Sequence, residues 1–179
     1  MNNLARGGGS DSSQPLVKTA KVAHRLRAAP IVRASGFTVV EFLIAMAVVL
    51  TIAAIAIPNY LAALDQAKIA RAVGDIRTIG NAVVGYDLIN GVYPDTLDQV
   101  GYGANLDPWG TPYQYLNFAS VNGKGKMRKD RFLVPINTYF DLYSMGKDQQ
   151  TVTPLTAPVS KDDIIWANDG AFIGLASDY

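Results

Sequence analysis

The sequence predicts an α+β fold in which a long N-terminal α-helix, transmembrane in its first half, packs on a small antiparallel β-sheet with a C-terminal loop region. Residues 37–57 are apolar except for two threonines and one glutamate. At about 1.5 Å per residue this run forms a helix roughly 32 Å long, which matches a bilayer core of about 30 Å. Short strand-like runs at 112–116 and 139–146 follow, with Pro and Gly marking the turns.

Charge is distributed unevenly along the chain. Residues 1–36 carry six Lys or Arg and one Asp, whereas residues 37–179 carry ten Lys or Arg and fourteen acidic residues. A basic leader, an apolar span and an acidic body are the order expected of a membrane protein with its N-terminus inside and its C-terminal domain outside. The alternative is a basic tail on a soluble protein.

Composition excludes several kinds of chemistry. The chain has no cysteine, so disulfides and thiol chemistry are excluded. Its single histidine, His24, lies in the leader. Most nucleophilic and metal-hydrolytic mechanisms therefore lack their usual side chains in the body. We expect a protein that is not an enzyme; an enzyme or binding domain anchored by one helix is the alternative from another class.

Residues 1–36 are interpreted as a leader. Residues 7–13 are Gly- and Ser-rich, and residues 16–35 mix basic with apolar side chains. The second stretch is either a leader that is later removed, which we favour, or a segment lying on an anionic membrane surface. No alanine-x-alanine site follows the apolar run, so ordinary signal-peptide removal is not expected.

The segment Gly36-Phe-Thr-Val-Val-Glu41, followed by the apolar run, resembles the prepilin cleavage motif of type IV pilins and type II secretion pseudopilins. The resemblance implies that a prepilin peptidase cuts between Gly36 and Phe37 and methylates the new amino group of Phe37. Family leaders are often shorter, and a start at Val32 is an alternative to the long leader.

Glu41 is the only glutamate in the chain. An unpaired acid inside the membrane costs on the order of 2.5–3.5 kcal/mol, so it needs a counter-ion. After cleavage the amine of Phe37 would lie one helical turn away, in the same helix or in a neighbour. Pairing between neighbours would set the axial register of an assembly, the role that the resemblance implies for Glu41. The alternative is that Glu41 reaches the lipid headgroups near the helix end.

Pro58 ends the apolar span and is expected to kink or locally melt the helix, which then resumes. A single apolar stripe continues beyond it; its members are Leu61, Leu64, Ile69, Val73, Ile76, Ile79 and Val83. Asn90-Gly91 is a typical signal for the C-terminal end of a helix, so the helix is expected from Phe37 to about Ile89.

Two motifs in the body resemble the type II secretion major pseudopilin. One is Asp-Pro-Trp-Gly-Thr-Pro-Tyr at 107–113, where Trp109 is interpreted as an anchor of the core or turn. The other is Tyr-Ser-Met-Gly at 143–146. Between them, residues 122–131 form a basic excursion that we interpret as a solvated hairpin tip rather than a phosphate contact.

In the same family the loop after this second motif binds a structural calcium ion. The resemblance maps Asp162 and Asp163 as ligands, with Met145 and Asp148 contributing nearby oxygens. Calcium takes six to eight oxygens and accepts backbone carbonyls from irregular loops, so the proposal is chemically sensible. The alternative is a helix cap or a solvated acid pair.

The resemblance implies a division into a removed leader (1–36), a transmembrane segment (37–58), a periplasmic half-helix (59–91) and a small globular domain (92–179). It implies a single-pass protein of the bacterial inner membrane that assembles into a periplasmic or surface filament. The expected partners are other copies of the chain, the prepilin peptidase, the assembly platform and ATPase, minor pseudopilins and membrane lipid, with no nucleic acid. An external type IV pilus is the alternative to a secretion pseudopilus.

Overall fold

The computed structural model describes residues 36–179, and the predictions for the leader before Gly36 lie outside the described residues. One long helix, α1 (Val39–Asn90), is followed by four short strands and several 3-10 turns. The helix agrees closely with the predicted span and ends before Gly91, whose φ of 72° is a conformation that favours glycine.

The helix continues beyond Pro58 as predicted, and of the two predicted effects, a kink or local melting, the melting does not occur. Proline removes one backbone hydrogen bond, but the helical hydrogen bonds of the turns on either side persist. The predicted apolar stripe is only partly buried. Ile76, Ile79 and Val83 lie in the core, whereas Leu61 and Leu64 stay 55% and 41% exposed.

The strands form one antiparallel sheet in the order β1-β2-β3-β4. Their bounds are β1 (Gln114–Asn117), β2 (Phe140–Ser144), β3 (Ile164–Ala167) and β4 (Phe172–Leu175). The sequence placed β1 and β2 correctly to within two residues. The apolar end at 172–175 pairs with β3 as an edge strand, and its Ile173 and Leu175 pack against the same cluster as the helix.

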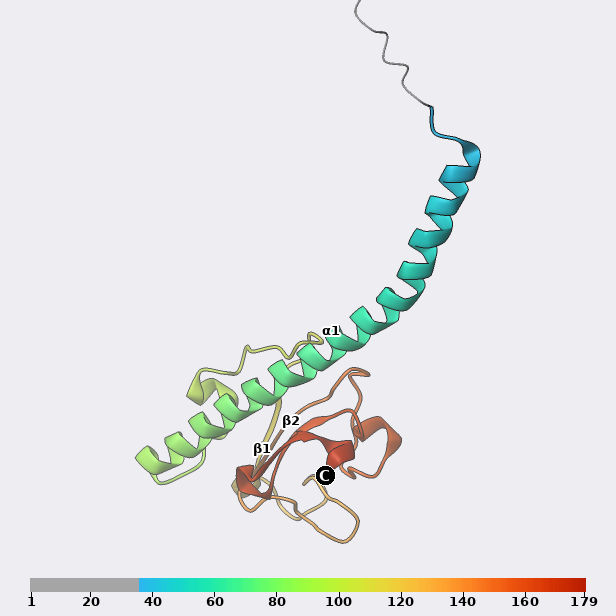
Figure 1. Cartoon of the computed structure of the whole chain (residues 1–179). Helices are drawn as coiled ribbons and strands as arrows, with labels where there is room; N and C mark the ends of the chain where they lie inside the picture. The colour runs from blue at the N-terminus through green and yellow to red at the C-terminus, as the bar shows by residue number, and fades with distance from the viewer. Residues whose placement is uncertain (1–35) are drawn as a thin grey trace, which may run out of the picture. The chain divides into compact units, whose positions relative to one another are not determined.

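Both faces of the sheet are covered. Alternate residues of β2 and β3 pack with the C-terminal half of α1, which Figure 1 shows lying across one face of the sheet. This cluster contains Ala72, Ile76, Ile79, Val83, Leu97, Tyr113, Phe140, Leu142, Ile164 and Trp166. The opposite face is covered by loop residues, with Ile136 and Leu155 against Ile165 and Ala167. Burial on both faces explains why β3 is apolar throughout.

The turn before β1 is held by one buried carboxylate. Asp107 accepts hydrogen bonds from the backbone amides of Trp109 (3.0 Å) and Thr111 (2.8 Å), from the Thr111 hydroxyl (2.6 Å) and from the Ser144 hydroxyl at the end of β2 (2.6 Å). Burial by itself would raise the pKa of Asp107, but these hydrogen bonds outweigh it and lower the pKa below the ordinary 3.8. The Asp-Pro-Trp-Gly motif is therefore a turn anchored to the sheet, and Trp109 packs beside the core as predicted.

Gly80 is the position on α1 where Trp166 approaches the helix backbone. A Cβ on Gly80 would lie 2.3 Å from Cζ3 of Trp166, whereas one on the exposed Gly74 would meet nothing within 4 Å. We expect Gly80→Ala to reduce the free energy of unfolding by about 1–3 kcal/mol through overpacking. Gly74→Ala, the matched control, should raise it by up to about 1 kcal/mol. Denaturant unfolding of the detergent-solubilised chain measures both; equal effects would contradict this packing.

Asp107→Ala should reduce the free energy of unfolding by at least about 2 kcal/mol, because a buried donor left unsatisfied costs about 1–3 kcal/mol. The folded-state pKa of Asp107 lies below 3.8, so its ionised form contributes stability above about pH 4 and loses it as pH falls through the folded-state value. The gap between wild type and variant, followed by urea unfolding, should therefore shrink in acid. A gap that stays constant would disprove the assignment, and the exposed Asp178→Ala is the control.

Candidate functional site

The first candidate site is the N-terminus of α1. Oε2 of Glu41 accepts hydrogen bonds from the backbone amide (2.9 Å) and the hydroxyl (2.8 Å) of Thr38. The Thr38 hydroxyl in turn accepts from the backbone amide of Glu41 at 3.2 Å. This reciprocal pair is a capping box, in which Thr38 is the N-cap and Glu41 is the third helical residue.

Sequence reasoning missed this cap, although the pattern Thr-x-x-Glu before an apolar run is its usual signature. It gives Glu41 a structural partner that is already present before any cleavage. Both hydrogen bonds that the Glu41 carboxylate accepts use Oε2, and they hold it at the end of the helix where Phe37 lies in sequence. A carboxylate at a helix N-terminus is also favoured by the helix dipole.

Gly36 and Phe37 precede the helix in exposed, non-helical backbone, and Phe37 is 73% exposed. Proteolytic sites are usually accessible segments of this kind. The structure is thus compatible with a cut between these two residues, and processing at this bond stays a prediction.

Apolar side chains cover the first half of α1 on all sides. Among the described residues, α1 is the one helix long and apolar enough to cross a membrane, and none of its most apolar window is buried. Large apolar side chains from Val39 to Leu64 are exposed to between 41% and 75%. A continuous apolar surface of this kind needs lipid or other protein to cover it.

The second candidate site is the loop between β2 and β3. Oδ2 of Asp162 accepts hydrogen bonds from the backbone amides of Lys147 (2.8 Å) and Asp148 (3.0 Å), which ties the end of the loop to its beginning. Gly146 has a φ of 66°, and a Cβ there would lie 2.2 Å from the carbonyl oxygen of Asp162. The loop therefore closes on a glycine that no other residue can replace without a shift of the backbone.

Asp163 is fully buried immediately before β3, and it contacts Arg128 of the basic excursion. Its Oδ2 accepts hydrogen bonds from Nη2 of Arg128 and from the Thr151 hydroxyl, the latter at 2.6 Å. Burial raises the pKa of the Asp163 carboxyl to about 6, and the positive charge of Arg128 opposes that shift. Arg128 itself is only 3% exposed, so the prediction that residues 122–131 form a solvated tip is wrong at this residue.

The four predicted calcium ligands can be tested against this geometry. Oδ2 of Asp162 is engaged by two loop amides, and Oδ2 of Asp163 is engaged by a guanidinium and a hydroxyl. Within residues 36–179, no three His, Cys, Asp or Glu side chains come close enough together to hold a metal ion. The guanidinium of Arg128 already binds Asp163, and its positive charge would repel a divalent ion there. The carboxylates of Asp162 and Asp163 do not fit a calcium site as arranged, and the oxygens expected from Met145 and Asp148 stay predictions.

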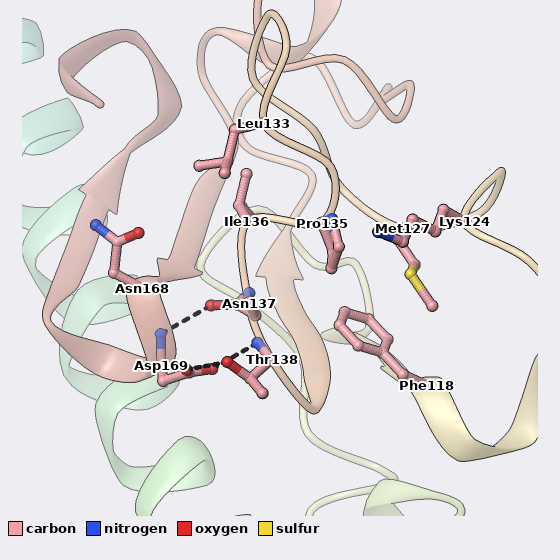
Figure 2. A pocket seen from close by; sticks show the side chains of 10 residues that line it. All are labelled: Phe118, Lys124, Met127, Leu133, Pro135, Ile136, Asn137, Thr138, Asn168 and Asp169. Carbon is pink, nitrogen blue, oxygen red and sulfur yellow. Dashed lines mark hydrogen bonds between the residues drawn. The ribbon is translucent and has the colours of Figure 1, made fainter.

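A groove of about 700 Å³ opens on the loop side of the sheet, between the segment leading into β2 and the turn after β3 (Figure 2). Its polar groups are already paired. Both carboxylate oxygens of Asp169 accept from Thr138, and the amide of Asp169 donates to Asn137. In the part of the chain that the structure describes, the groove therefore offers no free acid, base or nucleophile aligned for catalysis.

Similarity to known proteins covers most of the chain. The chain is 33% identical to the type II secretion system core protein G of Pseudomonas aeruginosa. The 135 aligned residues cover 64% of this chain and 84% of that protein. It is 31% identical over 142 residues to the protein of the same name from Aeromonas hydrophila, covering 68% and 88%. The Vibrio cholerae protein of that name is 31% identical over 136 residues, covering 65% and 82%.

No protein-family model matches the chain, and no solved structure matches it. The identity and coverage shared with these relatives exceed what a common fold alone would require. The long apolar helix on a four-stranded antiparallel sheet is the arrangement that the leader and body motifs led us to expect. The chain belongs to the family of type II secretion system core protein G, the G-type major pseudopilins.

Proposed function

We propose that this protein is the structural subunit of a pseudopilus filament, which polymerises through α1 and drives protein export by type II secretion. The observation that carries the proposal is the uncovered apolar surface of the first half of α1. A surface of this size is stable in lipid or in a bundle of like helices, and not in water. The family of the chain supports the bundle.

Before assembly, α1 would span the bacterial inner membrane once, with the domain at 92–179 in the periplasm. The excess of basic residues before Phe37 favours that orientation. An assembly ATPase and a platform protein would then move the subunit from lipid into the filament, together with minor pseudopilins. Because neighbouring α1 helices replace lipid, little apolar surface is exposed to water at any stage.

Processing would prepare the helix end for assembly. A prepilin peptidase would cut between Gly36 and Phe37 and N-methylate Phe37, which leaves an ammonium group beside Glu41. The capping bonds to Thr38 use one carboxylate oxygen of Glu41. The other oxygen can accept from the ammonium group of a neighbouring subunit, and that ion pair would fix the axial register. The cap then positions the carboxylate that the neighbour needs.

The alternative within the same class is a type IV pilin that forms an external fibre for adhesion, motility or DNA uptake. The relatives found are all core proteins of type II secretion systems, which favours the pseudopilus. They are components of a secretion apparatus, and we propose no enzymatic role for this chain.

The two roles of Glu41 can be separated by three variants. Glutamine can still cap a helix as the third residue, so Glu41→Gln keeps the cap and removes the charge. Thr38→Val removes the two capping bonds that use the hydroxyl and keeps the charge and the backbone amide of residue 38. If the ion pair drives assembly, Glu41→Gln and Glu41→Ala should both abolish filaments in electron micrographs, whereas Thr38→Val should retain them. Membrane insertion, checked by fractionation, should be normal in all three.

Filaments formed by Glu41→Gln at wild-type abundance would show that the charge is dispensable and that capping is the role of this residue. Normal filaments from Glu41→Ala would remove Glu41 from assembly altogether.

The processing step predicts the mass of the protein in the membrane. Intact-mass spectrometry of chain expressed with its prepilin peptidase should give residues 37–179 plus one methyl group. Expression without the peptidase should leave the precursor uncut, which is the control. A mature chain beginning at any residue other than Phe37 would reject the cleavage site.

A further inference from the structure

The basic excursion is tied by its backbone to the loop that precedes β3. The amide of Lys129 donates to the carbonyl of Thr153 (3.1 Å), and the carbonyl of Lys129 accepts from the amide of Leu155 (2.9 Å). The amide of Arg128 donates to Oδ2 of the buried Asp141 in β2 at 2.6 Å. These bonds fix the backbone of Arg128 on the face of the sheet opposite α1.

From there the Arg128 side chain reaches into the loop. Its guanidinium donates to the carbonyl of Val152 (2.8 Å), to the Thr151 hydroxyl and to the carboxylate of Asp163. Its Cζ atom lies 4.3 Å from the centroid of the Tyr143 ring. A carboxylate, a hydroxyl and a carbonyl are the oxygen types that a bound hard cation would take.

We propose that the guanidinium of Arg128 is the built-in cation that closes the loop between β2 and β3, so that this domain folds without the calcium ion that its sequence suggests. The arginine forms an ion pair with Oδ2 of Asp163, whose Oδ1 has no hydrogen-bond partner among the described residues, and its backbone amide donates to a second buried carboxylate, Asp141. Both acids are at most 1% exposed, so the charge of each has to be compensated inside the domain by an opposite charge or by hydrogen bonds.

A tethered cation differs from a bound metal in one respect. A metal stabilises the folded state only to the extent that its free concentration exceeds its dissociation constant. The guanidinium belongs to the chain and stays protonated at all accessible pH values, so its contribution does not depend on the free calcium concentration. The stability of the loop should therefore not respond to calcium.

Arg128 also gives the basic excursion at residues 122–131 a structural role. Arg128 is the one of its five basic side chains that is buried, and the carboxylate it binds lies 35 residues along the chain. The others are exposed or half-exposed; they are Lys124, Lys126, Lys129 and Arg131. The excursion thus places one basic side chain, Arg128, inside the domain, and its other four basic side chains contact solvent.

The test uses the full chain in detergent. Thermal unfolding of the wild type is compared in excess calcium chloride and in excess chelator, and calcium is titrated calorimetrically. Arg128→Gln is compared with Lys126→Gln, which makes the same charge change at an exposed position of the same segment. We expect the wild-type Tm to be the same in both media, with no saturable calcium binding. Arg128→Gln should lower the folding equilibrium constant on the order of a hundredfold or more, because it leaves a buried carboxylate uncompensated.

Lys126→Gln should leave the folding equilibrium within about threefold of wild type. A wild-type Tm that rises with calcium, together with stoichiometric binding, would overturn the proposal, as would equal stability of the two variants. If Arg128→Gln does not fold, the wild-type comparison between calcium and chelator decides alone. None of these measurements depends on whether the chain polymerises.

Discussion

The apolar surface of α1 is the constraint on which the rest of this protein depends. Its first half leaves large side chains uncovered on every side, and the domain covers only the second half, around Ile76 to Val83. Burial of apolar surface is worth about 25 cal/mol per Å², so this half cannot remain in water at any stage. Lipid and neighbouring helices can both cover it. A subunit whose helix moves directly from lipid to neighbouring helices, without contacting water, is suited to a filament that grows from a membrane.

Glu41 is the one acidic residue between Phe37 and Leu64. Glu41 is held by Thr38 in a capping box, which fixes where its carboxylate lies at the helix end. Apolar helices alone can slide past one another with little change in energy, because their contacts are not directional. One charged group at a fixed height on each helix makes a single register better than the others. We regard the charge as the feature that sets this register, and the cap as a restraint on where the carboxylate lies.

Sequence reasoning predicted the long helix, strands at 112–116 and 139–146 that lie within two residues of β1 and β2, and the turn at Asp107, because these depend on local periodicity and on Pro and Gly. It did not identify Arg128 as buried. A run of five basic residues looks solvated, and nothing local shows which member meets Asp163, 35 residues further on. The exposure of Leu61 and Leu64 was missed for a similar reason. An apolar stripe predicts that a surface is covered, without saying whether the same chain or another covers it.

The account is tested most directly by determining the filament structure by electron cryomicroscopy at a resolution that shows side chains. It predicts a core of packed α1 helices, with the carboxylate of Glu41 within about 4 Å of the amino group of Phe37 in an adjacent subunit, as an ion pair requires. A filament in which Glu41 contacts only Thr38 of its own helix, with the amino group of Phe37 paired elsewhere, would contradict it.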